Sequence, residues 1–209
     1  MTRAFVYTEL QISVPFDSAP WRDLNPVLLQ QQGFVNKTWL SGVGTNSVGG
    51  FYEFDSIENA KKFVTDYFPN EARKFGVAQT TRVFDADVVE EASVYLNSLY
   101  HGGTLADEPG AFVYTEAQIA APFAQAPWAA MNPVLKAQPG LLHKAWLSGV
   151  GTNSVGGFYA FDTIENGTKF ATDYFPTEAK SLDVAYTTRV FDAAIVREAS
   201  RPLHSHFVK

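Results

Sequence analysis

The sequence contains no cysteine among its 209 residues. This absence excludes disulfides, thiolate nucleophiles and iron–sulfur clusters held by cysteine. Positive charge is also scarce, because 16 Lys and Arg residues stand against 22 Asp and Glu residues, for a net charge of −6. Nucleic-acid binding needs clustered Lys and Arg to neutralise phosphates, so we expect no nucleic-acid partner.

Long apolar runs are also missing. No segment approaches the roughly 20 apolar residues of a membrane helix, and the first residues, MTRAFVYTELQISVP, show no apolar core followed by a cleavage site. We therefore expect a cytoplasmic protein with no membrane partner.

Metal and hydrolase signatures are absent as well. The chain has four histidines, and no His, Asp and Glu set repeats at a ligand spacing. His143 is a candidate haem ligand, but the equivalent residue of the other half is Asn36. No G-x-S-x-G elbow occurs. We predict neither a metal site nor any other cofactor.

The sequence does contain a duplication. The stretch AFVYTE occurs at Ala4 and at Ala111, an ungapped offset of 107, and WLSGVGTNSVGGFY occurs at Trp39 and at Trp146. This period is too long for a solenoid repeat and indicates a duplicated domain. We predict one domain over residues 1–96, a Gly- and Pro-containing linker over 97–110, and a second domain over 111–209.

Each half has the pattern of four strands and two helices. In the first half, alternation predicts strands over residues 5–13, 35–42, 51–54 and 77–84. A helix is expected from Pro20 to about Gln31, with Ser18 as a candidate cap. A second helix is expected from the capping box DSIE, with Asp55 as cap, through a restart at Pro69 to Gly76. A trailing helix follows over 87–99.

This βαββαβ order predicts an α+β fold of the ferredoxin-like type, with two helices on one face of a four-stranded antiparallel sheet. The other face would be exposed and aromatic, so it needs a partner. We predict that the two units pack sheet-to-sheet as an α+β barrel.

The glycine-rich stretch resembles a phosphate loop only superficially. Gly44 and Gly49 have P-loop spacing, but Gly50 stands where a Lys is required. A strand follows it, whereas phosphate loops open a helix. The stretch therefore predicts a β-hairpin with positive φ angles. An alternative is a loop that also covers a pocket, with Asn46 and Asn153 as polar contacts.

The segment QPGLLHKAWLSGVGTNSVGGFYAFD, from Gln138, resembles the YdhR-like mono-oxygenases of the dimeric α+β-barrel superfamily. The matching features are the PG before the second strand, the K-x-W motif, the loop ending in GG, the following Tyr, and the closing VFD. The resemblance covers both halves. It implies a cofactor-free mono-oxygenase related to those of antibiotic biosynthesis, acting on an aromatic or polyketide-like molecule with molecular oxygen. The family builds its barrel from two chains, so a homodimer stays open here.

Strand alternation predicts which side chains share a face. We expect one face of the first sheet to carry two aromatic and three charged residues, and the second sheet to present their equivalents. The sets are Tyr7, Glu9, Lys37, Trp39 and Arg82, and Tyr114, Glu116, Lys144, Trp146 and Arg189. In a barrel these would point inward, where charges must pair, so Glu9–Arg82 and Glu9–Lys37 salt bridges are one interpretation.

The other interpretation is catalytic. Glu9 or Glu116 would act as a base, Arg82 or Arg189 would stabilise the anion, and Tyr7 or Tyr114 would donate a hydrogen bond. Lys37, Trp39, Lys144 and Trp146 would bind the substrate, with His143 beside them in the second half. Catalysis through a deprotonated substrate needs no metal or flavin.

A second location for the pocket lies between sheet and helices within each unit. Its expected lining includes sheet residues and helix aromatics, namely Thr8, Leu40, Val83, Trp21, Phe63, Tyr67 and Phe68, with Trp128, Phe170, Tyr174 and Phe175 in the second half. Two further functions stay open: an isomerase, cyclase or lyase that uses the same pocket without oxygen, and a non-catalytic binding or stress-related protein.

Overall fold

The computed structural model describes residues 2–12, 14–119 and 121–209 and contains two four-stranded sheets. The first sheet has the order β2-β3-β1-β4, with every described pairing antiparallel. Its strands are β1 (Ala4–Leu10), β2 (Phe34–Ser41), β3 (Val48–Phe54) and β4 (Gln79–Asp85). Ser13, the predicted end of the first strand, lies outside the described residues.

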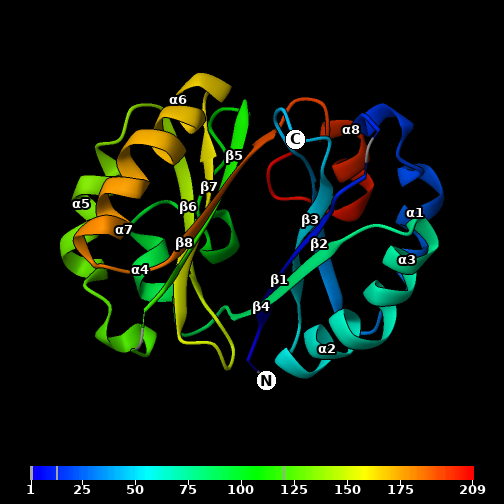
Figure 1. The fold of residues 1–209 in the computed structure, drawn as a ribbon, viewed down its shortest axis with the longest axis horizontal. Helices are drawn as coiled ribbons and strands as arrows, with labels where there is room; N and C mark the ends of the chain where they lie inside the picture. Colours follow the sequence, from blue (N-terminus) through cyan, green and yellow to red (C-terminus); the bar gives the residue numbers. More distant parts are fainter. Residues whose placement is uncertain (1, 13, 120) are drawn as a thin grey trace. The chain divides into compact units, whose positions relative to one another are not determined.

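Three helices cover one face of this first sheet, as Figure 1 shows. They are α1 (Trp21–Leu28), α2 (Ile57–Lys62) and α3 (Phe68–Phe75). A 3-10 turn at Phe16–Ser18 precedes α1, whose N-cap is Pro20. Ser18 was the expected cap and instead belongs to that turn.

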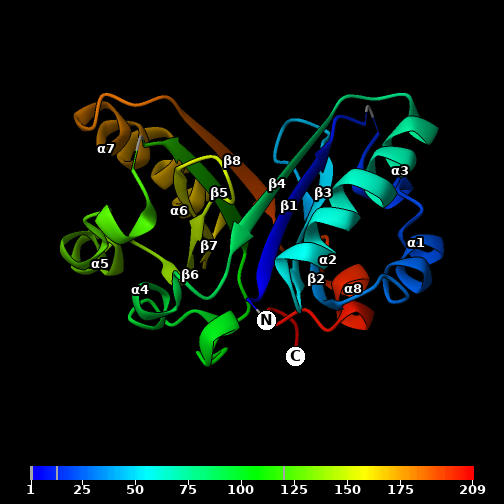
Figure 2. The same cartoon turned by 90° about the horizontal axis from the view of Figure 1, so that it is seen from below.

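The second unit repeats the first. Its sheet has the order β6-β7-β5-β8, and α5 to α7 cover one face of it (Figure 2). The elements are β5 (Ala111–Gln118), a 3-10 turn (Phe123–Gln125), α5 (Trp128–Lys136), β6 (Leu141–Ser148), β7 (Ser154–Phe161), α6 (Ile164–Lys169), α7 (Phe175–Ser181) and β8 (Tyr186–Asp192). Two ferredoxin-like units are thus confirmed.

The hairpin between β2 and β3 is confirmed but shorter than expected. Gly49 and Gly50 belong to β3, which therefore begins at Val48 rather than at Phe51. A hydrogen bond that Gly42 N–H donates to Ser47 O, at 2.9 Å, closes the turn of the hairpin. Positive φ occurs at Gly44 and Asn46, as a hairpin of this kind requires.

The second helical region of each unit starts one residue later than predicted. Ser56, not Asp55, is the N-cap, because its hydroxyl accepts a hydrogen bond from Asn59 N–H. The helix then widens into a π-helical turn (Phe63–Tyr67) before α3 begins with Pro69 in its first turn. Proline has no N–H to donate to the preceding turn, which explains the interruption. The second unit has the same turn at Phe170–Tyr174.

The segment after each fourth strand packs on the sheet of the other repeat. Helix α4 (Glu90–Val94), in the segment after β4, contacts β6, and α8 (Arg197–Ser200), in the segment after β8, contacts β2. Single-turn 3-10 helices follow them at Leu99–His101 and Arg201–Leu203. The compact units are Met1–Asp85 with Asp192–Lys209, and Ala86–Phe191. The predicted boundary at residue 96 and the linker over 97–110 therefore lie inside the second unit.

These exchanged segments cover edge strands. Trp39 N–H donates to Ser200 Oγ at 2.9 Å, and Trp146 N–H donates to Ser93 Oγ at 2.9 Å. The hydroxyls thereby satisfy backbone donors that an open sheet edge would leave unpaired. Within the described part of the chain, no helix is long and apolar enough to cross a membrane.

Candidate functional site

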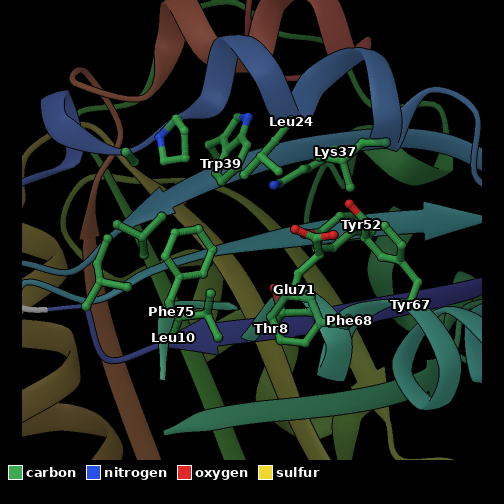
Figure 3. A pocket seen from close by; sticks show the side chains of 16 residues that line it. Thr8, Leu10, Leu24, Lys37, Trp39, Tyr52, Tyr67, Phe68, Glu71 and Phe75 are labelled. Atoms are coloured by element: carbon green, nitrogen blue, oxygen red, sulfur yellow. The ribbon is translucent and has the colours of Figure 1, made fainter. Parts of the chain in front are cut away.

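Each unit holds a cavity between its sheet and the helices that cover it. In the first unit, Thr8, Lys37, Trp39 and Tyr52 form the sheet side (Figure 3). Helical residues complete the wall, including Leu24, Tyr67, Phe68, Glu71 and Phe75. The cavity has a volume of about 60 Å³, which leaves room for a few water molecules only.

The equivalent cavity of the second unit is much larger, at about 400 Å³. Trp146 and Tyr159 form its sheet side, and Tyr174, Phe175 and Glu178 reach it from the helical side. Small-molecule sites are typically apolar clefts of about 300–1,000 Å³ with a few polar groups. Only the second of these two cavities meets that description.

Two of the aligned lining positions carry smaller side chains in the larger cavity. Leu10 lines the first cavity where Ala117 lines the second, and Phe75 lines the first where Leu182 lines the second. Both changes remove side-chain atoms from the wall, and a rigid fold closes such a gap only partly. The duplicated sequence has therefore produced one filled and one open cavity.

The GG pair explains how the sheet side of each cavity is built. A β-carbon at Gly156 would collide with the backbone carbonyl of Thr115. A β-carbon at Gly157 would lie 2.6 Å from Lys144 Cε and 2.6 Å from Tyr159 Cε2. The first glycine thus permits close strand approach, and the second leaves space for a lysine and a tyrosine.

Each unit contains a buried lysine on the helix side of its sheet; Lys37 lines the first cavity, whereas Lys144 is not among the residues that line the second. Lys37 and Lys144 are each 1% exposed. Lys144 Nζ lies 2.8 Å from the centroid of the Trp146 ring and 4.9 Å from that of Tyr159, and it has no hydrogen-bond partner in the described structure. Burial lowers the pKa of both lysines well below its ordinary value. Each lysine is therefore an amine that loses its proton easily.

The tyrosines beside the lysines stay protonated. Burial, and to a smaller extent the neighbouring Glu71 or Glu178 charge, raises the pKa of Tyr67 and Tyr174 to about 12. Burial also raises the pKa of Tyr159. These hydroxyls can donate hydrogen bonds to a ligand but do not act as bases at neutral pH.

The carboxylates of the two cavities differ in their partners. Glu71 forms an ion pair with Lys74 at 2.6 Å. The residue equivalent to Lys74 is Ser181, whose hydroxyl donates to the backbone carbonyl of Glu178. Among the described residues, no cation pairs with the Glu178 carboxylate. The carboxylate at the second cavity therefore lacks the lysine partner that the one at the first cavity has.

Part of the predicted assignment of side chains to sheet faces agrees with the structure. Sheet register places Tyr7 opposite Arg82, and Tyr7 Oη donates to Glu9 Oε2 at 2.7 Å. In the second unit Tyr114 Oη donates to Glu116 Oε2 at 2.8 Å. Arg82 and Arg189 each donate to the preceding carbonyl, of Thr81 and Thr188.

The placement of Lys37 and Trp39 on that same face is wrong. Lys37 pairs across strands with Tyr52, and Tyr52 pairs with Val6, so Lys37 faces the helices. The same holds for Lys144 and Trp146 through Tyr159. A Glu9–Lys37 salt bridge is therefore excluded, because the two side chains leave opposite faces of the sheet.

The expected lining of the helix-side cavity needs similar corrections. Tyr67 and Tyr174 line the two cavities, whereas Trp21, Trp128 and Leu40 do not. Leu40 lies one position from Trp39 and faces the other way. His143 instead contacts Asn97, with Nδ1 2.8 Å from the Asn97 carbonyl oxygen.

Sequence reasoning missed Tyr159, Glu178 and their equivalents Tyr52 and Glu71. The tyrosine follows the GG pair, so the motif carried a signal for it. The glutamate stands on an amphipathic helix, where an acidic residue is ordinarily a solvated one. In the described residues, no three His, Asp or Glu side chains form a metal-binding group.

Comparison of the sequence with protein-family models and with curated proteins gives no match. Solved structures do match in fold. An anthrone oxidase-like protein superimposes with a TM-score of 0.60 at 14% identity, over 92% of this chain and 91% of the other. A monooxygenase-like protein from Listeria innocua gives 0.50 at 10% identity, over 91% and 94%. A mutant chlorite dismutase from Candidatus Nitrospira defluvii gives 0.52 at 7% identity, over 98% and 95%.

At such identities the likeness concerns the fold alone. It establishes a ferredoxin-like α+β architecture of the kind found in proteins related to antibiotic-biosynthesis monooxygenases. Because the similar structures include differently described proteins, the fold by itself does not select a reaction.

Proposed function

We propose that this chain is a mono-oxygenase that acts on an aromatic or polyketide-like small molecule through a deprotonated substrate, without a cofactor. The open cavity of the second unit carries the proposal. It combines about 400 Å³ of volume with an aromatic wall of Trp146, Tyr159, Tyr174 and Phe175. Such walls favour flat aromatic ligands.

The chemistry fits the cavity's groups. An activated ring CH₂ loses a proton, and the electron-rich anion reduces molecular oxygen. One oxygen atom becomes a carbonyl oxygen of the product, and the other leaves as water. An apolar cavity that excludes water strengthens each electrostatic contact to the anion. The similarity in fold to an anthrone oxidase-like protein supports this choice of substrate class.

The carboxylates Glu9 and Glu116 do not line either cavity. The proposal therefore places the reaction on the helix side of the second sheet and does not use them. The predicted catalytic roles of Glu9, Glu116, Tyr7, Tyr114, Arg82 and Arg189 remain a separate hypothesis that concerns the other sheet face.

Anthrone is a suitable probe, with oxygen uptake and quinone absorbance as readouts. The variant Ala117→Leu/Leu182→Phe gives the second cavity the two side chains that fill the first, so it should abolish binding and oxygen uptake. The variant Leu10→Ala/Phe75→Leu gives the first cavity the smaller pair. It should raise binding, measured by titration calorimetry, from one probe per chain to two.

The outcomes separate the alternatives. Full oxygen uptake in the filled variant would move the reaction away from this cavity, and Glu116→Gln would then test the other face. Turnover in the absence of oxygen would favour an isomerase, cyclase or lyase. Probe binding without any turnover would favour a binding protein.

A further inference from the structure

The helical wall of the large cavity contains one acidic side chain. The helical residues that line the cavity are Tyr174, Phe175, Glu178, Ala179 and Leu182, and their spacing places them on one face of the helix. Glu178 is half-buried and lies within this otherwise apolar and aromatic face. An acidic residue there breaks the amphipathic pattern, and such local violations are expected at functional positions.

The equivalent glutamate of the first unit shows how this side chain is directed. Glu71 occupies the same position on α3 and lines the first cavity, with 13% of its side chain exposed. Figure 3 shows its carboxylate pointing into the space that the lining residues surround. Glu178 lines the second cavity from the equivalent position of α7, so its carboxylate can contact a ligand there.

The two glutamates differ in their partners. Lys74 Nζ lies 2.6 Å from Glu71 Oε1, whereas Ser181 stands at the position of Lys74 in the second unit. The Ser181 hydroxyl donates to the backbone carbonyl of Glu178 and not to its carboxylate. Among the described residues, no group donates a hydrogen bond to that carboxylate or forms an ion pair with it. Both of its oxygens are therefore available to a ligand.

The other lining residues do not offer a base. Among those that the structure describes, the remaining side chains are apolar, aromatic or, at Gln125, an amide. Tyr159 and Tyr174 keep their protons at neutral pH, because burial raises the pKa of both. A proton that leaves a ligand in this cavity therefore has the Glu178 carboxylate as its acceptor.

We infer that the Glu178 carboxylate removes the proton from the activated ring CH₂ of the ligand. The inference rests on the proposed function and names its base. The ligand C–H bond breaks, an O–H bond forms on Glu178, and the electron pair moves through the ring onto the ligand's carbonyl oxygen. No oxidant takes part in this step, because molecular oxygen reacts with the anion afterwards.

The step moves a negative charge without adding one. The charge is on Glu178 before the transfer and on the ligand after it, when Glu178 is neutral. A flat ligand that fills the cavity displaces water from the wall, and a carboxylate without water accepts a proton more readily. The protonated Tyr174 can donate a hydrogen bond to the anion. An anion can therefore form in a cavity whose described lining residues include no cation.

The test uses the full chain and anthrone in deuterated buffer without oxygen. Proton removal can be measured there by itself, as exchange of the CH₂ hydrogens for deuterium followed by NMR. The wild-type protein should accelerate this exchange above the rate in buffer. Glu178→Gln keeps the size of the side chain and removes the proton acceptor. It should slow the exchange and, in air, the oxygen uptake by about a hundredfold or more, while anthrone binding changes by less than about threefold.

The first unit provides a matched control. Glu71→Gln makes the same change at the equivalent position beside the filled cavity, so it should behave as wild type. Glu178→Asp keeps a carboxylate but shortens the side chain by one methylene. It should recover part of the exchange rate that Glu178→Gln loses, which an amide of unchanged size cannot do.

Each other result overturns a stated part. Exchange that persists in Glu178→Gln overturns the assignment of the base, whereas oxygen uptake by the wild-type protein still supports the proposed function. An equal loss in Glu71→Gln also overturns the assignment, because the effect would not depend on the large cavity. A wild-type protein that neither accelerates exchange nor consumes oxygen overturns both. Circular dichroism of every variant confirms that the fold is intact.

Discussion

A β-carbon on Gly157 would lie 2.6 Å from Cε of Lys144, so the lysine occupies space that only a glycine on the neighbouring strand leaves open. The same relationship holds between Gly50 and Lys37, at 2.5 Å. The glycines of the repeated motif therefore leave room for the buried lysine side chains and allow the strands to pack closely.

The two glycines of the pair should respond differently to alanine. Gly156→Ala pushes its methyl group into the backbone of Thr115, which cannot move without distorting the strand pair. We expect it to lower the free energy of unfolding by about 3 kcal/mol. Gly157→Ala meets side chains that can shift, and should cost about 2 kcal/mol. Urea denaturation measures both.

Gly151 provides the control for these substitutions. It has no atom within 4 Å of the added carbon, but its φ is +75°. Alanine there should cost about 1 kcal/mol from backbone strain alone. If Gly156→Ala were no more destabilising than Gly151→Ala, the close strand approach would not be what requires the glycine.

The buried lysines predict a pH dependence of stability. The pKa of Lys37 and Lys144 is lowered by burial in the folded protein, well below the 10.5 of an exposed lysine. Between these values the unfolded chain binds more protons than the folded one, so stability rises with pH. The penalty is complete below the folded pKa and disappears as pH approaches 10.5.

Lys37→Met/Lys144→Met should therefore be more stable than wild type at neutral pH, by about 1–4 kcal/mol. The difference should narrow as the pH is raised, and thermal or urea unfolding across the alkaline range measures it. Lys62→Met, which changes a half-exposed lysine paired with Glu58, should alter stability by less than about 0.5 kcal/mol. A constant advantage at every pH would show that the lysines are not discharged by folding.

The repeat, the element order and the hairpin were all readable from the sequence, because each depends on local patterns. The face of the sheet that carries Lys37 was not predictable from the sequence. Alternation shows that Lys37 and Trp39 share a face, but only the pairing of Lys37 with Tyr52 and of Tyr52 with Val6 decides which one. We expected Glu9, Lys37 and Arg82 to share one face of the sheet, whereas the strand register places Lys37 on the opposite face.

The difference between the cavities was also beyond sequence reasoning. Leu10 and Ala117 are aligned, as are Phe75 and Leu182, and the exchanges look conservative. Their effect on volume becomes visible only when strand and helix bring the two positions to one wall. The packing of the segments after β4 and β8 could not be predicted either. Ser93 and Ser200 align in the duplication, but the alignment does not show on which repeat each serine packs.

Asn25 joins three parts of the first unit. Its amide donates to Ala199 O at 2.8 Å, and its carbonyl accepts from Trp39 Nε1 at 2.9 Å. Asn25→Ala leaves both buried partners unsatisfied and should cost about 2–4 kcal/mol in urea denaturation. Asn132→Ala should cost a similar amount, because Asn132 makes the same contacts to Ala92 O and Trp146 Nε1.

An exposed asparagine provides the comparison. Asn70 donates to Asp66 O on a solvated helix face, so Asn70→Ala should change stability by less than about 0.5 kcal/mol. Equal effects of Asn25→Ala and Asn70→Ala would mean that the buried bridge adds nothing beyond the local helix.

The exchange of the segments after β4 and β8 predicts whether each half folds as an isolated fragment. Residues 86–191 form a continuous compact unit and should fold as a fragment. Residues 1–96 lack the segment 192–209, in which Ser200 Oγ accepts from Trp39 N–H and Ser205 Oγ is hydrogen-bonded to Thr38 Oγ1. We expect that fragment to be unfolded or loosely packed, and a peptide of residues 192–209 to restore its near-ultraviolet circular dichroism.

The serine contact gives this experiment a matched control. A Ser200→Ala peptide keeps the apolar contacts of α8 but leaves Trp39 N–H without its acceptor, so it should bind about tenfold more weakly. If residues 1–96 instead folded alone, the segment after β4 would be able to cover β2 of its own repeat. The exchange would then occur in the full chain without being required for either unit to fold. Residues 1–96 would be an independent domain.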